Sequence, residues 1–482
     1  MLRPIALVLL CLMLVAGCTP NERIDVGRRP ATARPIASPS EPSREPVGRG
    51  VRWESRGTPI GFGHGLVVLG QEIGVRAFPL HCRRPCEPAF TTGLHTYDPA
   101  LVRHDVAYVG TDRGVAILSL GCSGSCGPIG WLRSGDVADP SFDGYLAEPA
   151  NRYVPVGIAG GHVLVQVGWD GASGSGVYLS RLAAFPLDCR HKCVPEWTSP
   201  LGAGRLPPAV AGGLVLAPRI GRVDAFPAGC ARRRCAPMWT GVLYRRPDIT
   251  WTETPVVAGG LAVVSTNGCV CGADSDIPRV EAFPLWCGTD GATCQPAWSI
   301  RLPWTRFNSG LVVHEGVAYV ATEGTAARTG TAAVGYPVKC TGTCEPSIQL
   351  ALGRVESGTA PVFADGSSFV LTRSTNRLLA FRDPCTGSCR PVAAVPLPHA
   401  GSGPFIARGS VLVAAGRDLI GYPLEPRADV WRRSWTWRAP FRIEDVRVRG
   451  RFAIVWAHNR TIELDLQILE RPDDLPSRTA SW

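Results

Sequence analysis

Lysine is nearly missing from this chain of 482 residues, since Lys192 and Lys339 are the only two among 50 basic residues. The net charge of +10 is therefore carried almost wholly by arginine. This imbalance indicates a general bias towards arginine, so runs such as Arg232–Arg234 are interpreted as solvated surface. Charged residues make up only 19 % of the chain, and nothing in this composition indicates a long solvated tail.

Long uninterrupted helical stretches are also missing. The chain contains 55 glycines and 43 prolines, which interrupt it every few residues, and each of them destabilises a helix interior. A helical bundle or a coiled coil is thereby excluded. Because 45 % of the residues are hydrophobic, a core can still form, and the composition favours a protein of many short strands.

No catalytic motif stands out. The chain shows no Ser-His-Asp context, no phosphate-cradling glycine loop and no outstanding carboxylate pair, so no catalytic residue is predicted. An acidic group between residues 132 and 153 lacks the alternating spacing of a calcium loop, and no metal site is predicted there. Its members are Asp136, Asp139, Asp143 and Glu148.

What the chain does contain begins with an N-terminal export signal at residues 1–18. Arg3 precedes an apolar run, Ile5–Ala16, which is too short to span a bilayer comfortably. The run ends in Leu-Val-Ala-Gly before Cys18, which resembles a bacterial lipobox, where the signal is cut directly before a lipidated cysteine. We predict that Cys18 anchors the protein to the cell membrane on its extracytoplasmic side, with a plain secretory signal as the alternative. Either route allows disulfides to persist.

Residues 19–50 are rich in proline, serine and arginine and show no hydrophobic periodicity. We predict a disordered tether, which would span about 30 Å as a coil and up to about 100 Å when extended.

The remaining chain repeats one phrase seven times. A large apolar residue lies four positions before a first cysteine, and a second cysteine is followed by x-Pro, as in AFPLHCRRPCEP. A tryptophan follows three of the second cysteines by four residues, and an eighth copy around Ile420–Trp431 has lost its cysteines. Upstream of each phrase, short β-branched runs flank a tight turn. Four short strands in every 40–60 residues are typical of propeller blades.

The pattern W…TPVVAGGLAVVST…VEAFP…W resembles the blade repeat of the pyrroloquinoline-quinone-like (PQQ-like) β-propellers, over residues 51–467. This resemblance implies an all-β, single closed propeller of about eight four-stranded blades. A ninth candidate lies at Phe441–Leu466 and could pair with a strand around Trp53, so that both chain ends would share one blade. The count of eight or nine stays open, and residues 468–482 are assigned to a C-terminal tail.

The paired cysteines are predicted to form seven structural disulfides, each closing the turn between the third and outermost strands of a blade. Cross-strand neighbours lie at a suitable separation for this bond. Metal ligation would need four converging ligands, whereas cysteines of successive blades lie far apart around a ring. The predicted pairs are Cys82 with Cys86, Cys122 with Cys126, Cys189 with Cys193, Cys230 with Cys235, Cys287 with Cys294, Cys340 with Cys344, and Cys385 with Cys389.

Cys269 and Cys271 lie outside the repeated phrase, in a glycine-rich insertion. A staple of this loop is the favoured interpretation, with a strained and easily reduced disulfide as the alternative. Quinoprotein dehydrogenases carry adjacent cysteines above their cofactor, but Val270 separates these two.

Length variation is concentrated in the loops between second and third strands and between blades, which share one face of a propeller. We expect a binding surface there, with tolerated insertions as the alternative. Four of the nine histidines lie at or beside the first hairpin turn and are interpreted as turn-surface residues. They are His64, His104, His162 and His314.

Two functions follow from these patterns. The preferred one is a lipid-anchored, extracytoplasmic, non-catalytic scaffold that binds a protein or an anionic envelope polymer and needs no cofactor; no nucleic-acid partner is expected. The alternative, implied by the family resemblance, is a dehydrogenase that depends on PQQ or a metal such as calcium.

Overall fold

Each repeat begins with two β-branched runs joined by a tight turn. In the unit around residue 212, Gly212 and Gly213 form this turn with φ of 57° and 76°. Both values lie in the left-handed region, where glycine carries no steric penalty, and two successive residues of this kind match the twist of a hairpin. The Gly-Gly pair therefore sets where the first strand ends and the second begins.

The computed structural model describes residues 50–71, 74–80, 82, 86–96, 98–133, 152–169, 179–200, 202–203, 206–243, 251–267, 279–302, 305–324, 331–340, 344–351, 358–372, 375–399, 401–426, 431–457 and 460–470. The predicted signal, Cys18, nearly all of the tether, Cys269, Cys271 and most of the long loops lie outside these residues.

The strands of the first three blades follow the order of the chain from the axis outwards. Blade 1 contains β2 (Thr58–Gly63), β3 (Leu66–Gln71), β4 (Gly74–Pro79) and β5 (Phe90–Thr92). Blade 2 contains β6 (Leu101–Arg103), β7 (Val106–Thr111), β8 (Gly114–Ser119) and β10 (Gly130–Leu132). Blade 3 contains β11 (Arg152–Ala159), β12 (His162–Trp169), β13 (Leu179–Pro186), β15 (Trp197–Thr198) and β16 (Gly202–Ala203).

The middle three blades repeat this order. Blade 4 contains β17 (Ala209–Ala211), β18 (Leu214–Arg219), β19 (Arg222–Pro227) and β20 (Trp239–Val242). Blade 5 contains β21 (Trp251–Thr252), β22 (Val256–Ala258), β23 (Leu261–Asn267), β24 (Arg279–Pro284) and β26 (Trp298–Arg301). Blade 6 contains β27 (Thr305–His314), β28 (Val317–Gly324), β29 (Thr331–Pro337) and β30 (Ile348–Ala351).

The last three blades complete the ring. Blade 7 contains β31 (Val362–Ala364), β32 (Ser367–Thr372), β33 (Arg377–Arg382) and β35 (Ala393–Pro396). Blade 8 contains β36 (Gly401–Ala407), β37 (Ser410–Ala415), β38 (Asp418–Pro423) and β39 (Trp435–Arg438). Blade 9 contains β40 (Asp445–Arg449), β41 (Phe452–Ala457), β42 (Arg460–Asp465) and, outermost, β1 (Val51–Arg56).

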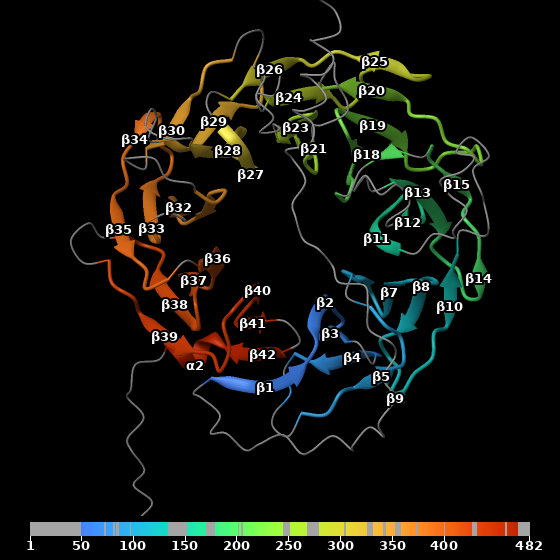
Figure 1. The fold of residues 1–482 in the computed structure, drawn as a ribbon, viewed down its shortest axis with the longest axis horizontal. Coiled ribbons are helices and arrows are strands. Elements are labelled where there is room, and N and C mark those ends of the chain that lie inside the picture. The colour runs from blue at the N-terminus through green and yellow to red at the C-terminus, as the bar shows by residue number, and fades with distance from the viewer. Residues whose placement is uncertain are drawn as a thin grey trace, which may run out of the picture. The chain divides into compact units, whose positions relative to one another are not determined.

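The protein is thus an all-β propeller, and its blade count is nine (Figure 1). The closure predicted for the ninth unit is confirmed, because β1 pairs antiparallel with β42 and places Trp53 opposite Glu463. Both ends of the propeller chain therefore lie in blade 9. A five-residue helix, α2 (Leu466–Glu470), follows β42, and among the described residues no helix is long and apolar enough to cross a membrane.

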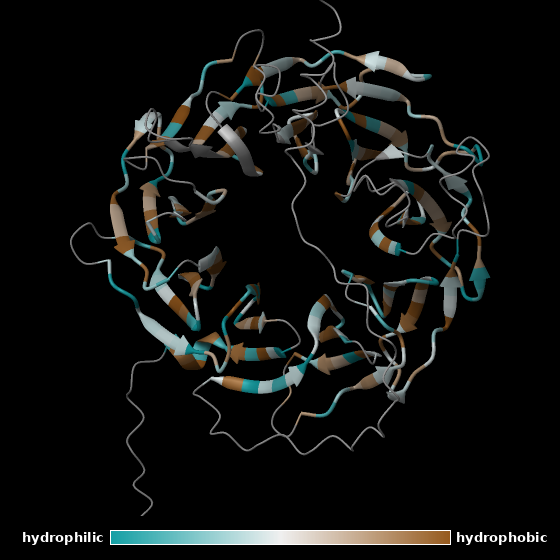
Figure 2. Ribbon diagram, viewed as in Figure 1, coloured by the Kyte–Doolittle hydropathy of each residue, from teal (hydrophilic) through white to brown (hydrophobic). Residues whose placement is uncertain are grey.

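The repeated aromatic residues form the contacts between blades. Trp197 of blade 3 stacks on Phe226 of blade 4 with ring centroids 6.4 Å apart, and Trp239 stacks on Phe283 in the same way at 6.1 Å. Trp53 fills this place at the closing seam, 4.9 Å from Phe78 of blade 1. Hydrophobic residues consequently concentrate in the strands around the ring (Figure 2). The spacing of tryptophan and phenylalanine in the sequence reflects this contact between neighbouring blades.

The disulfide turns also bind the ring together, which the sequence does not reveal. Residues inside four of these turns form short strands that pair in parallel with the outer strand of the preceding blade. A parallel bridge between Thr198 and Arg234 adds a fifth contact of this kind. The four strands are β9 (Gly124–Ser125), β14 (Lys192–Cys193), β25 (Ala292–Cys294) and β34 (Gly387–Cys389). We call each such pairing a clasp. A clasp covers an outer strand edge that would otherwise expose unpaired backbone groups.

Candidate functional site

The seven cysteine pairs of the repeated phrase are disulfide-bonded in the structure, with Cα atoms 5.6–6.3 Å apart. Each bond lies between the third strand of a blade and its outer strand. The clasp at β34 shows which segment the disulfide holds in place. Inside the Cys385–Cys389 turn, the Gly387 amide donates a hydrogen bond to the Ser347 carbonyl of blade 6 at 2.8 Å. The disulfides therefore hold a turn that contacts two blades.

The four turn histidines differ in their surroundings. His64 and His104 occupy left-handed turn positions with φ of 51° and 50°, and both are exposed. Nε2 of His162 lies 2.7 Å from Oε2 of the exposed Glu196. His314 alone of the four lies beside two carboxylates. The interpretation as turn-surface residues therefore describes His64 and His104. His162 begins β12 with a side chain only 12 % exposed, and His314 is treated below.

The innermost strands surround the axis of the ring (Figure 1). Their described sequences are mostly small and apolar, and Asp445 is the single carboxylate within them. Burial raises the pKa of Asp445, while the Val446 amide and the Arg447 charge offset part of the rise. Basic residues are more frequent on the same strands, and two of them form a distinct group.

Arg447 and Arg449 are exposed and lie two residues apart on β40, so they share one face of the strand. The guanidinium carbon of Arg447 lies 5.7 Å from the ring centroid of Phe62 and 5.6 Å from that of Trp456. Arg449 lies 5.8 Å from the same Phe62 ring. Phe62 belongs to β2, so this group joins blade 9 to blade 1. We call these four residues the arginine–aromatic seam.

Asp445 lies two residues before Arg447 on the same face of β40 and interacts with its charge, but the two side chains form no ion pair. Elsewhere in blade 9, Arg52 forms an ion pair with Asp465 at 2.5 Å, and Arg460 is paired with Glu54. Within the described part of the chain, neither Arg447 nor Arg449 makes such a pair. Their positive charge is therefore available to a ligand, while the aromatic rings hold the guanidinium groups by cation–π attraction. In the sequence, this surface is indicated only by the alternation of arginine and valine in Asp445–Arg449, which places both arginines on one face of a strand.

A buried carboxylate lies in the same blade, where β1 meets β42. Glu463 is fully buried, and burial raises its pKa to about 8, a rise that the neighbouring Trp53 and Arg52 only partly oppose. At neutral pH this side chain is therefore mostly protonated. It belongs to the closure of the ring rather than to its surface.

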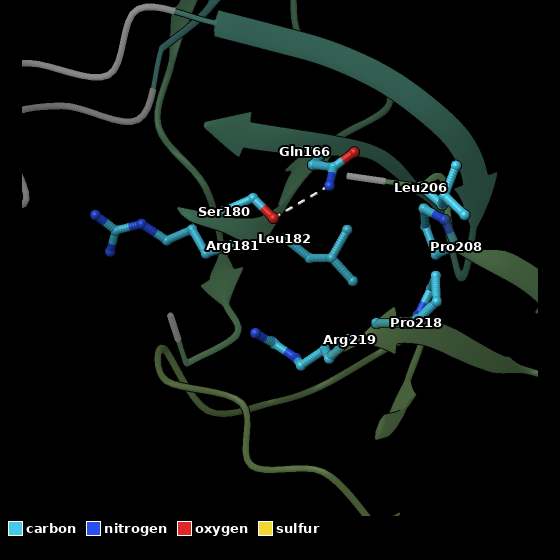
Figure 3. A pocket seen from close by; sticks show the side chains of 9 residues that line it. Gln166, Ser180, Arg181, Leu182, Leu206, Pro208, Pro218 and Arg219 are labelled. Atoms are coloured by element: carbon cyan, nitrogen blue, oxygen red, sulfur yellow. Dashed lines mark hydrogen bonds between the residues drawn. The ribbon is translucent and has the colours of Figure 1, made fainter. Parts of the chain in front are cut away.

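A small cavity lies between blades 3 and 4 (Figure 3). Its volume of about 20 Å³ is close to the space needed for a single water molecule. Arg219, which lines it, contacts Asp224 Oδ2 at 2.7 Å and donates to the Pro200 carbonyl at 2.9 Å. Across the cavity, Gln166 donates to the Ser180 hydroxyl at 3.1 Å. Because these polar groups already have protein partners and the space is so small, we interpret this cavity as part of the packing.

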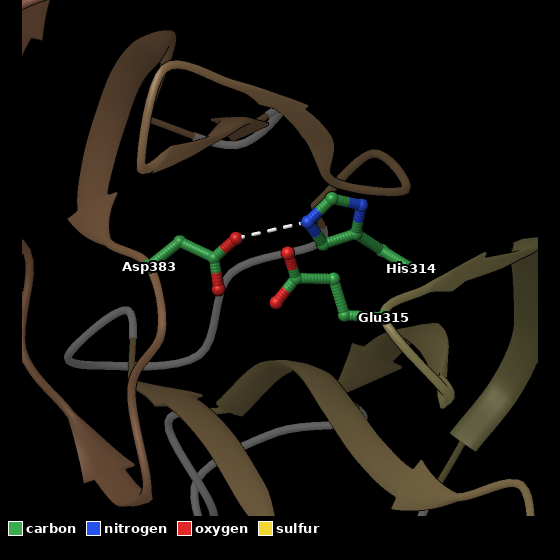
Figure 4. A group of neighbouring side chains, drawn as sticks. All are labelled: His314, Glu315 and Asp383. Atoms are coloured by element: carbon green, nitrogen blue, oxygen red, sulfur yellow. Dashed lines mark hydrogen bonds and ion pairs between the residues drawn. The ribbon is translucent and has the colours of Figure 1, made fainter.

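His314, Glu315 and Asp383 form a cluster between blades 6 and 7 (Figure 4). One potential ligand atom from each side chain lies within 4.8 Å of the other two. Nε2 of His314 lies 3.0 Å from Oδ2 of Asp383, and the imidazole stacks on Phe363 of blade 7 with centroids 4.0 Å apart. Sequence reasoning missed this cluster because 69 residues separate the histidine from the aspartate.

No family model matches the chain, and no curated protein matches it. Among solved structures, the computationally designed Ika8 protein is 8 % identical, with a TM-score of 0.48 over 86 % of this chain and 100 % of that protein. BamB from Moraxella catarrhalis is 12 % identical, with a TM-score of 0.45 over 86 % of this chain and 98 % of that one. Hsv2p from Kluyveromyces lactis is 8 % identical, with a TM-score of 0.39 over 81 % and 99 %.

Proposed function

We propose that the chain is a membrane-anchored, extracytoplasmic lipoprotein whose PQQ-like propeller is a non-catalytic scaffold for a protein partner that carries an acidic segment. The observation behind this proposal is the arginine–aromatic seam, in which Arg447 and Arg449 are exposed, form no ion pair among the described residues and are supported by Phe62 and Trp456. The lipid anchor at Cys18 is proposed from the sequence alone.

The composition of the seam favours a protein over a simple polyanion. Arginine binds carboxylates through two parallel hydrogen bonds, and arginine with tryptophan dominates the energetic centres of protein interfaces. Phe62 adds an apolar surface that a polyphosphate would not use. The segment Arg438–Arg460 carries six arginines, of which Arg438, Arg451 and Arg460 pair with carboxylates outside it. The positive charge of Arg447 and Arg449 would also accelerate the encounter with an acidic partner.

The rest of the molecule suits a scaffold. Seven disulfides and the clasps restrain the ring, so a partner would meet a preformed surface and less ordering entropy would be lost on binding. The tether at residues 19–50 would hold the propeller within about 100 Å of the membrane.

Binding of a fluorescent glutamate-rich peptide to the full chain in detergent tests the proposal. We expect saturable binding that weakens on the order of ten-fold or more in the Arg447→Glu/Arg449→Glu variant, because two favourable charges become repulsive. The matched control is Arg232→Glu/Arg233→Glu, an equal charge change on exposed residues in the blade 4 disulfide turn. An equal loss of peptide affinity in both variants would show that only the net charge matters, and would contradict binding at the arginine–aromatic seam.

Two further outcomes would contradict the proposal. Binding of polyphosphate but not of the peptide would assign the seam to an envelope polymer. Reduction of a dye with an alcohol or sugar, after reconstitution with calcium and PQQ, would instead establish the dehydrogenase alternative.

A further inference from the structure

We propose that His314, Glu315 and Asp383 form a binding site for one divalent transition-metal ion of the zinc type, which joins blade 6 to blade 7. His314 ends β27, and Glu315 follows it in the turn to β28. Asp383 follows β33 in the next blade. The three ligand atoms already face one another across the contact between the blades (Figure 4).

The position of Asp383 is exceptional within the repeat. Asp383 lies two residues after Phe381, the large apolar residue that precedes the first cysteine of the repeated phrase by four positions. In every other blade the residue at the equivalent position is apolar and packs towards the preceding blade. These residues are Leu80, Leu120, Leu187, Ala228, Leu285, Val338, Leu424 and Leu466. Each donates its amide to a carbonyl in the first hairpin turn of its own blade, and Asp383 keeps this bond, to Gly366 at 2.8 Å. The backbone of the repeat is thus retained while a carboxylate replaces a core side chain.

His314 departs from the repeat at the facing position. The residue before the first turn is alanine in five blades: Ala159, Ala211, Ala258, Ala364 and Ala407. Blade 6 carries a histidine there, and the aspartate that it meets lies in blade 7. Three other blades also lack the alanine, with Gly63, Arg103 and Arg449 in its place. What indicates a specific interaction is that the imidazole of His314 meets the carboxylate that occupies the apolar position of the next blade.

The cluster carries more negative charge than its surroundings neutralise. Across the described ranges, neither Glu315 nor Asp383 forms an ion pair with lysine or arginine, and the Asp383 carboxylate pairs with the His314 imidazole. Burial, followed by the charges of Asp383 and Glu315, raises the pKa of the nearby Tyr319 to about 12. A divalent cation would neutralise both carboxylates in one step.

The chemistry of the three ligands fits such an ion. One imidazole and two carboxylates provide three protein ligands, and a tetrahedral ion would keep its fourth position for water. Ligand atoms of a tetrahedral zinc site lie about 3.4 Å apart, so separations of up to 4.8 Å require a small inward movement. His314 is already oriented by its stacking on Phe363, and its side chain is 32 % exposed, which leaves a route for the ion.

Titration of the oxidised full chain with Zn²⁺, followed by calorimetry and thermal unfolding, tests the site. We expect one ion per chain and a rise in unfolding temperature. In Asp383→Asn and in Glu315→Gly, affinity should fall on the order of ten-fold or more. Glycine suits the left-handed φ of 47° at position 315, so the second variant removes the carboxylate without adding strain.

The matched control is His64→Gly, which replaces an exposed left-handed turn residue of blade 1 by glycine, as Glu315→Gly does in blade 6, and should leave zinc binding unchanged. Circular dichroism would confirm that each variant is folded. Undiminished binding in both Asp383→Asn and Glu315→Gly would overturn the site, and would point to other ligands such as Cys269 and Cys271. Absence of stoichiometric binding by the wild-type chain would overturn it as well.

Discussion

The indole Nε1 of Trp239 donates a hydrogen bond of 2.8 Å to the backbone carbonyl of Leu285, which lies in the following blade. Trp298 makes the same bond to Val338 at 2.8 Å. Each tryptophan thereby satisfies its polar atom and buries its ring in one contact. The outer strand of one blade and the disulfide turn of the next consequently act as a single structural unit.

Replacing Trp239 tests this contact. Trp239→Phe keeps an aromatic ring but leaves the Leu285 carbonyl without its donor, and should lower the free energy of unfolding by about 1 kcal/mol. Trp239→Ala adds a cavity and should cost about 3–5 kcal/mol. Denaturant unfolding measures both, with Trp286→Phe as the control because Trp286 is 64 % exposed. Equal stability of wild type and Trp239→Phe would refute the role of the hydrogen bond.

Removing one disulfide should affect the neighbouring blade. With Cys385→Ala/Cys389→Ala, we expect a loss of about 2 kcal/mol, the chain-entropy value for a short loop. Because β34 pairs with β30, hydrogen exchange should accelerate in β30 of blade 6. Cys122→Ala/Cys126→Ala is the reciprocal control, since its clasp covers β5 and should leave β30 protected. Changes confined to the mutated blade would show that the clasp does not depend on the bond.

Glu463 should make stability depend on pH. Its pKa is about 8 in the folded protein against an ordinary value of 4.5, so the folded state holds one more proton between these values. The free energy of unfolding should therefore be highest below the unfolded pKa and fall as pH rises through about 8. Glu463→Gln keeps the shape without a titrating group, and should flatten this profile and be the more stable form at high pH.

Urea midpoints at about pH 5 and about pH 8 measure this difference, each pKa unit corresponding to about 1.4 kcal/mol. Glu54→Gln serves as the control, because Glu54 lies on the paired strand β1 and is exposed. A wild-type profile that does not weaken with rising pH would contradict the buried-acid interpretation.

The closing strand offers a fourth test. Trp53 is buried between blade 9 and blade 1, where it stacks on Phe78. Trp53→Ala should leave a cavity at the only seam that joins the two ends of the propeller chain, and so release β1 more readily than other strands. Limited trypsin digestion should then cut at Arg52 or Arg56, whereas Trp286→Ala should resist. Equal resistance of both variants would mean that β1 is held without its tryptophan.

The blades could be predicted because each repeat carries local sequence patterns that mark its strands and turns. Glycine pairs mark the first hairpin turn of a blade. The large apolar residue before the first cysteine and the tryptophan after the second mark the third and outer strands. Trp53 also indicated how the ring closes. The clasps could not be predicted, since they join the turn of one blade to the edge of another and leave no local pattern. The cluster at His314 and Asp383 was hidden for the same reason, although both residues depart from the repeat. Two departures acquire meaning only when the fold shows that they face each other.

The clasps all run in one sense around the ring, from a later blade back to an earlier one. During synthesis from the N-terminus, an outer strand that takes part in a clasp therefore stays uncovered until the disulfide turn of the next blade has been added. Loss of a blade that provides a clasp therefore uncovers the outer strand of the blade before it, and loss of the N-terminal strand β1 uncovers β42 of blade 9.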